Sequence, residues 1–315
     1  MLKWIIGLVA LLALAIIVSG WWSTRSLKPL DAAARGLAGG DFVTVTDGQL
    51  HYRVAGPEDG PVIVMVHGFS TPNFIFEQNV DALAAAGFRV LRFDHFGRGW
   101  SDRPNTDYDV DFYDRELIEF LDAMNLTEPV GLVGLSMGGP ITAEFTARHP
   151  ERVRKLFLFV PAGFDISGAD SGAAKLLRIP ILGDWLWNLI GKSTLLGDAQ
   201  YDESALAPEN RLKGDVTQQM EYKGYLPALL SSLRHMPMAG RAETFARVRE
   251  LGVPVMAVFG DADATVQISS AAKLQAQIPG ADVRVLAGAG HGLNYQRHEE
   301  VNPMLIEWFA EPAVD

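Results

Sequence analysis

The chain has 315 residues, of which 48% are hydrophobic and 21% charged, so it can bury a sizeable core and is not expected to be disordered. Its net charge of −11 argues against a nucleic-acid-binding surface, and no run of lysine and arginine provides one locally. The absence of cysteine excludes disulfides, thiolate metal ligands and a cysteine nucleophile.

An apolar segment opens the chain. Residues 4–22 contain no charged side chain, and these 19 residues would form about 28 Å of helix, close to the hydrocarbon thickness of a bilayer. Trp4 at one end and Trp21 and Trp22 at the other lie where aromatic side chains flank a membrane span. We therefore expect residues 1–22 to form a single-pass transmembrane anchor, with the lipid bilayer as a partner.

The processing and the orientation of this segment stay open. A cleaved signal peptide is the alternative, with small residues at Val18-Ser19-Gly20, although the length of the apolar run and the tryptophans beyond it favour retention. The positive charges on its two sides, Lys3 against Arg25 and Lys28, nearly balance, so the side of the membrane is not determined. Residues 23–40, with three glycines, are expected to be a juxtamembrane spacer.

From residue 41 the chain alternates between short strands and helices. The residues around Asp47-Gly48 predict a β-hairpin, because Asp-Gly is a strong hairpin-turn signal. The continuous apolar run at residues 62–66 is typical of a parallel strand buried on both faces. The elements expected before residue 128 are the strands 42–46, 49–54, 62–66 and 88–93 and the helices 74–86 and 109–126. This alternation predicts an α/β fold with a mostly parallel sheet covered by helices on both sides.

A serine framed by glycines follows the next apolar run. Gly134-Leu135-Ser136-Met137-Gly138 is a G-x-S-x-G pattern, and a helix-like segment at residues 141–148 comes directly after it. A serine on a tight strand-to-helix turn holds its hydroxyl clear of the backbone, and small neighbours let strand and helix approach. The pattern alone occurs by chance in many chains. Set between a strand and a helix, it predicts that Ser136 is a catalytic nucleophile rather than part of a merely tight turn.

The alternation stops after a strand at residues 153–160 and resumes after about residue 240. Residues 161–240 are rich in Trp, Leu, Met and Pro, and we interpret them as an inserted helical cap over the ends of the strands. The elements expected afterwards are the strands 253–260 and 283–286 and the helices 269–278 and 299–309. The core would then comprise residues 41–160 and 241–315.

A serine nucleophile needs a base to take its proton and an acid to orient that base, expected in this order at the ends of later strands. His291 follows the last predicted strand in a glycine-rich loop and is the expected base, although a plain loop histidine is the alternative. Asp263 follows the strand before it and is the expected acid, with Asp261 as the neighbour that could be mistaken for it. The expected oxyanion hole consists of the backbone N–H groups of Met137 and Phe69.

Two other features near the predicted site receive structural interpretations. His67 is expected to hold its loop by hydrogen bonds, because a metal role would need partners that we do not find in the sequence. Gly97-Arg98-Gly99 lacks the spacing of a phosphate-binding loop and is predicted to be a turn beside the site. We therefore expect no metal and no cofactor.

Together these motifs resemble the α/β-hydrolase fold family over about residues 41–310. The segments that carry the resemblance are His67-Gly68-Phe69, Asp94-His95-Phe96-Gly97-Arg98-Gly99-Trp100-Ser101, Gly134-Leu135-Ser136-Met137-Gly138-Gly139, Gly260-Asp261-Ala262-Asp263 and Gly290-His291. The resemblance implies an eight-stranded, mostly parallel sheet with a cap after the sixth strand. A membrane-anchored chain with such an elbow and a helical cap is similar to monoacylglycerol lipases and related esterases. Haloalkane dehalogenases and epoxide hydrolases resemble it in layout, but they carry aspartate where this chain has Ser136.

We therefore expect a serine hydrolase that cleaves small hydrophobic or lipid-like carboxylic esters through an acyl-enzyme. Trp185, Trp187 and Leu189 of the predicted cap are the expected substrate contacts, although helix packing explains each of them about as well. A carbon–carbon bond hydrolase or a perhydrolase could use the same triad. A non-catalytic ligand receptor on this fold is a further alternative, against which the complete triad weighs.

Overall fold

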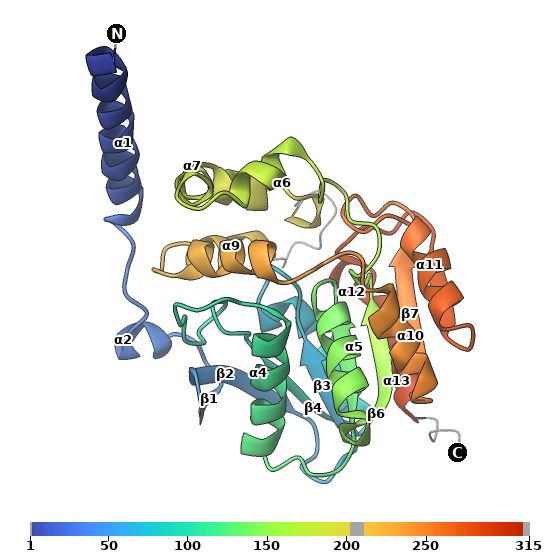
Figure 1. Ribbon diagram of the computed structural model, residues 1–315. Helices are drawn as coiled ribbons and strands as arrows, with labels where there is room; N and C mark the ends of the chain where they lie inside the picture. Colours follow the sequence, from blue (N-terminus) through green and yellow to red (C-terminus); the bar gives the residue numbers. More distant parts are fainter. Residues whose placement is uncertain (1, 202–210, 311–315) are drawn as a thin grey trace.

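The computed structural model describes residues 2–201 and 211–310, and within them the strands form one eight-stranded sheet (Figure 1). The strands are β1 (Asp41–Val45), β2 (Gly48–Ala55), β3 (Val62–Val66), β4 (Arg89–Phe93), β5 (Val130–Leu135), β6 (Val153–Phe159), β7 (Val255–Gly260) and β8 (Asp282–Leu286). They lie in the order β1-β2-β4-β3-β5-β6-β7-β8. β2 pairs antiparallel with β1 and β4, and the other neighbouring pairs are parallel. The predicted mostly parallel, eight-stranded sheet is thus confirmed.

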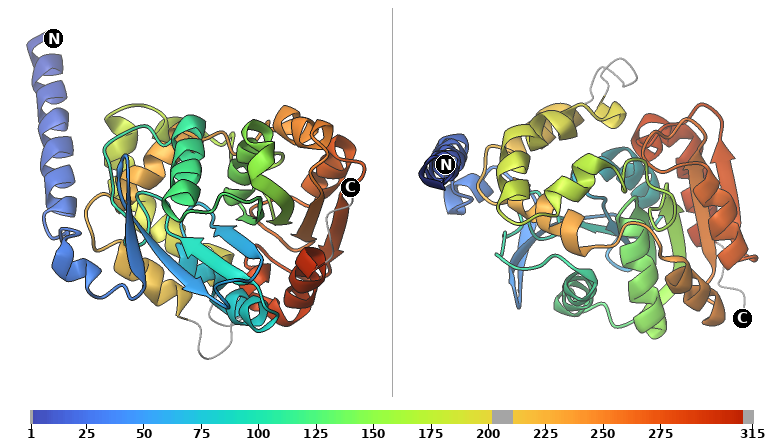
Figure 2. Two further views of the ribbon diagram at one scale, coloured as in Figure 1. Left: turned by 90° about the horizontal axis from the view of Figure 1, so that it is seen from below. Right: turned by 45° about the horizontal axis from the view of Figure 1, so that its top comes forward.

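Helices cover both faces of this sheet (Figure 2). One face carries α4 (Val110–Ala123), α5 (Gly138–Arg148), α10 (Ala242–Glu250) and α11 (Ser269–Gln277). The other carries η1 (Asn73–Phe76), α3 (Glu77–Ala85), α12 (Leu293–Gln296) and α13 (His298–Ala310). Along β3, Val64 and Val66 enter the first core and Ile63 and Met65 the second, because successive residues of a strand point to opposite faces. A strand covered on both sides buries every side chain, which explains the continuous apolar runs.

Between β6 and β7 the chain leaves the sheet and forms a helical layer. Its elements are α6 (Gly172–Leu177), α7 (Leu182–Leu196), η3 (Ala199–Tyr201), α8 (Leu212–Gln219) and α9 (Tyr225–His235). In Figure 1, α6, α7 and α9 lie above the sheet. Trp187 and Tyr225 are buried in the same hydrophobic core as β3 and α13, so this layer continues the core of the sheet. These helices occupy the interval of the expected cap, and we call residues 161–240 the cap from here on; the domain limits themselves stay a prediction.

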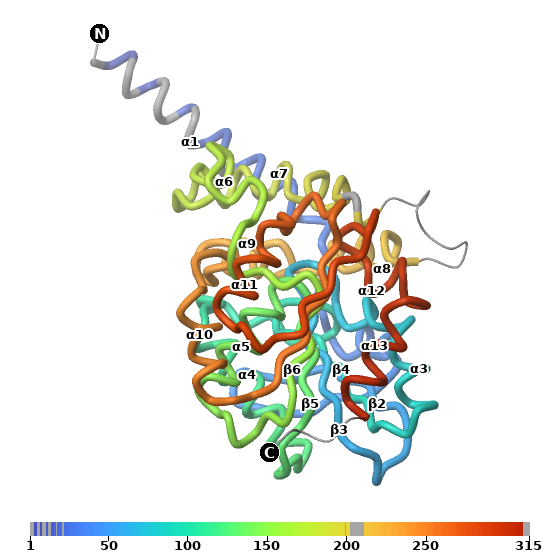
Figure 3. The backbone as a smooth tube through the Cα atoms, turned by 90° about the vertical axis from the view of Figure 1, so that its right-hand side faces the viewer, coloured from blue at the N-terminus to red at the C-terminus, as the bar shows by residue number. Residues whose placement is uncertain are grey.

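The N-terminal segment forms one helix, α1 (Leu2–Thr24), which extends away from the sheet (Figure 3). Several of its side chains lie outside the described residues. In the part of the chain that the structure does describe, no helix is long and apolar enough to cross a membrane, so the transmembrane part of the fold prediction is not confirmed. α1 meets the cap through Trp185, whose indole N–H donates to the Ser19 hydroxyl at 2.7 Å.

The segment predicted to be a spacer is attached to the core. It contains the short helix α2 (Ala32–Arg35), whose Ala34 packs with Trp100 and Tyr222 in a separate small hydrophobic cluster. Arg35 donates to the Gln49 side chain at 3.0 Å and pairs with Asp102. Residues 23–40 therefore fix where α1 leaves the domain.

Candidate active site

Ser136 lies in the turn between β5 and α5 with a φ of 52°, a left-handed conformation that a residue other than glycine rarely adopts. The turn is tight on both sides. A Cβ at Gly138 would come within 2.2 Å of the Val66 carbonyl oxygen, and a Cβ at Gly134 within 2.5 Å of the Thr142 hydroxyl. Glycine is therefore required on both sides of the serine, which is the physical reason for the G-x-S-x-G pattern.

The structure brings Ser136, His291 and Asp263 together in one hydrogen-bonded row. His291 Nε2 lies 2.9 Å from Ser136 Oγ, and His291 Nδ1 lies 2.8 Å from Asp263 Oδ2. The side chains of Asp263 and His291 are only 1% and 9% exposed. Because a carboxylate can only accept, the proton of the ring lies on Nδ1, and Nε2 is left to accept the hydroxyl proton of Ser136.

The backbone after β7 holds the Asp263 carboxylate in place. Asp263 Oδ1 accepts the N–H groups of Thr265 and Val266 at 2.7 and 2.9 Å, which directs Oδ2 to His291. Asp261 is exposed, and its carboxylate instead accepts the Gly288 N–H at 2.6 Å. Asp261 thus ties the loops after β7 and β8 together, while Asp263 faces the histidine.

The two predicted oxyanion donors lie beside the nucleophile. Met137 directly follows Ser136 at the start of α5, and Phe69 lies in the loop after β3. A Cβ at Gly68 would lie 3.1 Å from Ser136 Cβ, so this loop passes in direct contact with the serine. Within residues 2–201 and 211–310, neither the Phe69 nor the Met137 N–H donates a hydrogen bond to another group of the protein. Both donors are therefore available for an oxyanion.

Buried side chains hold the residues 68–71, which we call the oxyanion loop. Arg98, fully buried, donates through Nε to the Phe69 carbonyl at 3.0 Å and through Nη2 to Ser232 Oγ at 2.7 Å. The Tyr225 hydroxyl donates to the Ser70 carbonyl at 2.6 Å. Ser232 and Tyr225 belong to α9, so the cap supports the loop that carries one oxyanion donor. The sequence analysis identified a turn at Arg98 but missed this role, for which no local pattern exists.

A second cap tyrosine completes this support. The Tyr201 hydroxyl lies 2.5 Å from Thr71 Oγ1 and 3.1 Å from Ser70 Oγ. Burial raises the pKa of Tyr201 to about 12, so its hydroxyl stays protonated and can donate. The oxyanion loop is thus bonded to the cap at both its backbone and its side chains.

Replacing Tyr225 with phenylalanine is expected to lower kcat for the predicted ester hydrolysis about tenfold with little change in KM, because the buried Ser70 carbonyl loses its donor and the Phe69 N–H loses its fixed position. The matched control is Tyr222→Phe, which removes a hydroxyl from the same stretch of the cap beside Trp100. Steady-state kinetics and thermal melts of both variants provide the check. A Tyr225→Phe protein that melts earlier at unchanged kcat would limit Tyr225 to a role in stability.

Buried titratable groups adjoin the oxyanion loop. Asp94 accepts from the Asn73 and Trp100 N–H groups at 2.9 and 3.0 Å and meets His51 Nδ1 at 2.7 Å. Burial raises the pKa of Asp94, but the charge and the hydrogen bond of His51 outweigh it and hold this pKa far below its usual range. Asp94 is therefore ionised at neutral pH and pins the start of the loop that carries Arg98.

The two neighbouring histidines are neutral. Burial lowers the pKa of His95 to about 3 and that of His67 well below its ordinary value. His67 Nε2 accepts the His95 N–H at 3.0 Å, so its proton lies on Nδ1, 2.8 Å from the Gly68 carbonyl that accepts it. His67 thus joins the loops after β3 and β4, in agreement with its predicted structural role. No group of three or more metal-ligating side chains is arranged to hold an ion among the described residues.

The three predicted substrate contacts of the cap have separate surroundings. The Trp187 indole N–H donates to the Leu226 carbonyl at 2.8 Å and packs α7 on α9, whereas Trp185 bonds to Ser19 of α1. Leu189 is 46% exposed. Helix packing explains the two tryptophans, and a substrate role for any of the three stays a prediction.

Comparison with known proteins gives one family match, one sequence relative and two similar solved structures. A family model described as alpha/beta hydrolase fold matches residues 61–297. The chain is 27% identical over 285 residues to a 2-hydroxy-6-oxononadienedioate/2-hydroxy-6-oxononatrienedioate hydrolase of Paraburkholderia xenovorans, which covers 85% of this chain and 94% of that protein.

Among solved structures, the carboxylesterase CesB of Bacillus subtilis superposes with a TM-score of 0.72 at 20% identity, covering 94% of this chain and 97% of that one. A bromoperoxidase of Bacillus anthracis superposes with a TM-score of 0.67 at 21% identity, covering 87% and 100%. At these identities the two structures show a shared fold alone.

Proposed function

Because this chain belongs to the alpha/beta hydrolase fold family, we propose that it is a hydrolase in which Ser136 attacks the carbonyl of a hydrophobic carboxylic ester. The observation that carries the proposal is the 2.9 Å contact between Ser136 Oγ and His291 Nε2, continued at 2.8 Å to Asp263. A hydrogen-bonded row of hydroxyl, imidazole and carboxylate is the arrangement that nucleophilic acyl transfer requires.

The reaction would proceed in two halves. Ser136 Oγ forms a bond to the carbonyl carbon while His291 Nε2 takes the hydroxyl proton, and the N–H groups of Phe69 and Met137 stabilise the resulting oxyanion. The carbon–oxygen bond to the alcohol then breaks, and His291 returns the proton to the departing oxygen. A water molecule, deprotonated by His291, then attacks the acyl-enzyme. The bond from Ser136 Oγ to the acyl carbon breaks, His291 returns the proton to Oγ, and the acid is released. Asp263 stabilises the imidazolium in both halves.

A hydrophobic substrate is favoured by the surface of the cap. Large apolar side chains are exposed on α6, on α7 and in the turn between them: Leu176, Ile179, Ile181, Leu189 and Ile190. Apolar surface of this kind on the cap would favour esters with an apolar acyl or alcohol part.

Carbon–carbon bond hydrolysis is the second candidate, because the Paraburkholderia relative is named as a hydrolase of a dienedioate and matches over 94% of its length. Such a reaction would use the same serine, histidine and oxyanion donors, but a carbanion-like group would leave in place of an alkoxide.

One comparison separates these chemistries. Aryl esters from acetate to palmitate and a vinylogous 2-hydroxy-6-oxo diketone are offered to the same preparation in detergent. We expect kcat/KM for the preferred ester to exceed that for the diketone at least tenfold. A higher value for the diketone would replace ester hydrolysis by carbon–carbon hydrolysis. Absence of both activities, together with no labelling by a fluorophosphonate, would instead favour the non-catalytic receptor.

A further inference from the structure

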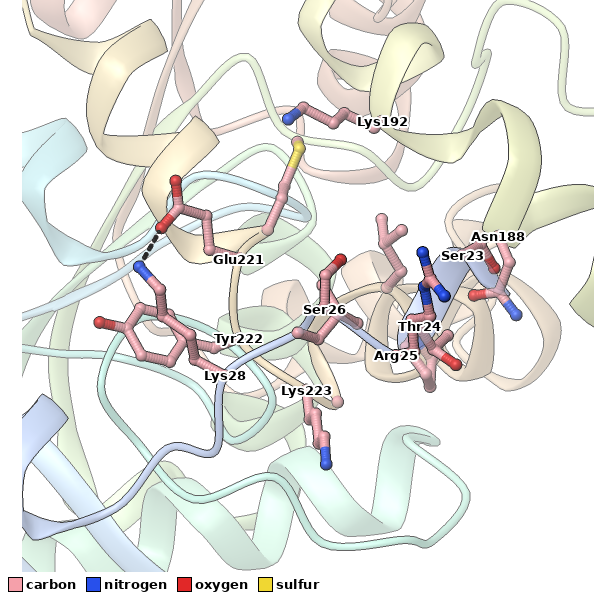
Figure 4. A pocket seen from close by; sticks show the side chains of 15 residues that line it. Ser23, Thr24, Arg25, Ser26, Lys28, Asn188, Lys192, Glu221, Tyr222 and Lys223 are labelled. Carbon is pink, nitrogen blue, oxygen red and sulfur yellow. Dashed lines mark hydrogen bonds and ion pairs between the residues drawn. The ribbon is translucent and has the colours of Figure 1, made fainter. Parts of the chain in front are cut away.

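A cavity of about 730 Å³ lies between the N-terminal segment and the cap, and none of its lining residues belongs to the triad (Figure 4). One wall is the chain from the end of α1 to Lys28, the second is α7, and the third is the turn between α8 and α9. These walls come from three parts of the sequence that only the fold brings together.

The charge of this cavity is opposite to that of the whole protein. Among the residues that the structure describes, Arg25, Lys28, Lys192 and Lys223 line it, with Glu221 as the one acidic residue. Lys28 Nζ pairs with Glu221 at 2.7 Å, and Lys192 and Lys223 give the described lining an excess of positive charge in a chain whose net charge is −11. Such a local excess attracts an anionic group, and the cavity is large enough for a phosphate with its substituents.

The backbone fixes these charges relative to one another. The Lys28 N–H donates to the Glu221 carbonyl at 2.8 Å, and the Lys223 N–H donates to the Lys28 carbonyl at 2.9 Å. Arg103 donates to the carbonyls of Tyr222 and Lys223 at 2.9 Å, which ties the same turn to the core. Lys28 and Lys223 therefore project from backbone segments that are bonded to each other and to the core.

Apolar surface adjoins the cavity. α1, which ends in the cavity wall, exposes Trp4 at 84%, Leu11 at 67% and Trp22 at 59%. α1 packs against α7 (Figure 3), and α6 and α7 also expose large apolar side chains. Exposed apolar side chains on neighbouring helices beside clustered lysine and arginine match the boundary between acyl chains and headgroups of an anionic bilayer.

We propose that this cavity binds the phosphate of an anionic phospholipid headgroup while α1 and the adjoining face of α6 and α7 lie against the acyl chains. Arg25, Lys28, Lys192 and Lys223 would supply the positive charge, with the ammonium and guanidinium groups as hydrogen-bond donors. The site goes beyond the proposed ester hydrolysis, since it would bind lipid whether or not Ser136 performs that reaction. For that reaction it would hold the cap at the surface where apolar esters concentrate.

The test is flotation of the full-length protein with vesicles of phosphatidylcholine alone and of phosphatidylcholine mixed with phosphatidylglycerol. Wild type is expected to partition more strongly to the anionic vesicles, and the excess is expected to fall as salt is added. The double variant Lys192→Glu/Lys223→Glu is expected to lose this preference at least about tenfold. The matched control, Arg247→Glu/Arg249→Glu on α10, makes the same change in net charge away from the cavity and should retain it.

Hydrolysis of a short soluble aryl ester is measured on the same samples, so that lipid binding and the proposed ester hydrolysis are tested independently. Unchanged ester hydrolysis in Lys192→Glu/Lys223→Glu shows that the variant is folded, so a loss of flotation is then a loss of lipid binding. Equal flotation with both vesicles, or equal losses in the two double variants, would overturn the proposal. Calorimetric titration of the protein with inorganic phosphate provides one more check. If phosphate binds saturably but the protein shows no preference for anionic vesicles, the lipid proposal is overturned and the cavity is assigned to a soluble phosphate compound.

Discussion

Replacing Ser136 with alanine is expected to lower kcat for ester hydrolysis by about 10⁴- to 10⁶-fold. Ser136 Oγ is the atom that His291 Nε2 contacts at 2.9 Å, and alanine removes it without changing the Cβ that the turn already accommodates. The fold should therefore be retained while the nucleophile is lost. Initial rates on the preferred aryl ester, with a thermal melt of the same sample, provide the measurement.

A nearby hydroxyl supplies the control for Ser136. Ser70 lies in the oxyanion loop, where its hydroxyl contacts Tyr201 and not the histidine. Ser70→Ala is expected to retain labelling by a fluorophosphonate, and Ser136→Ala to lose it. Labelling that survives in Ser136→Ala but disappears in Ser70→Ala would show that Ser70, and not Ser136, is the nucleophile.

Replacing Asp263 with asparagine is expected to reduce kcat by about 10³- to 10⁴-fold with a small effect on the melting temperature. The two N–H groups that Asp263 Oδ1 accepts would select the amide oxygen of the new side chain. The amide nitrogen would then face His291 Nδ1, so donor would meet donor and the ring would move its proton to Nε2. A histidine protonated at Nε2 cannot take the proton of Ser136.

Asp261 provides the matched control two residues away. Its carboxylate accepts only from the Gly288 N–H among the described contacts, a bond that an asparagine oxygen can also accept. Asp261→Asn is therefore expected to stay within about twofold of wild-type kcat. If Asp261→Asn were the inactive variant and Asp263→Asn the active one, the acid of the triad would have to be reassigned.

The agreement between sequence and structure is best where the information is local. The Asp-Gly turn predicted the hairpin of β1 and β2, and the apolar run at residues 62–66 predicted β3 to its exact bounds. The candidate triad could also be predicted from the sequence. Ser136, Asp263 and His291 each follow a parallel strand, and the carboxyl ends of such strands share one edge of the sheet. Their contacts follow from chain order and topology together.

The residues that surround the site could not be predicted from the sequence in this way. Arg98 and Ser232 are 134 residues apart, and Tyr225 and Ser70 are 155 apart. A donor to a backbone carbonyl leaves no spacing pattern in the sequence. The tryptophans of the cap were predicted to contact substrate from their apolar character alone. Their actual neighbours, Leu226 and Ser19, depend on how α7 packs on α9 and α1.

The sequence by itself determined the order of strands and helices, the tight turn at Ser136 and the positions at which a base and an acid follow the later strands. The backbone conformation of a segment depends mainly on residues close to it in the chain, and its spacing of apolar residues indicates which side is buried. Patterns of a few residues therefore suffice to predict a strand, a helix or a turn. Only the tertiary structure decided which groups support the oxyanion loop and which lysines surround the cavity beside α1. Those arrangements join segments more than 100 residues apart, as Lys28 and Glu221 do, and arise when the cap and the N-terminal segment pack on the core.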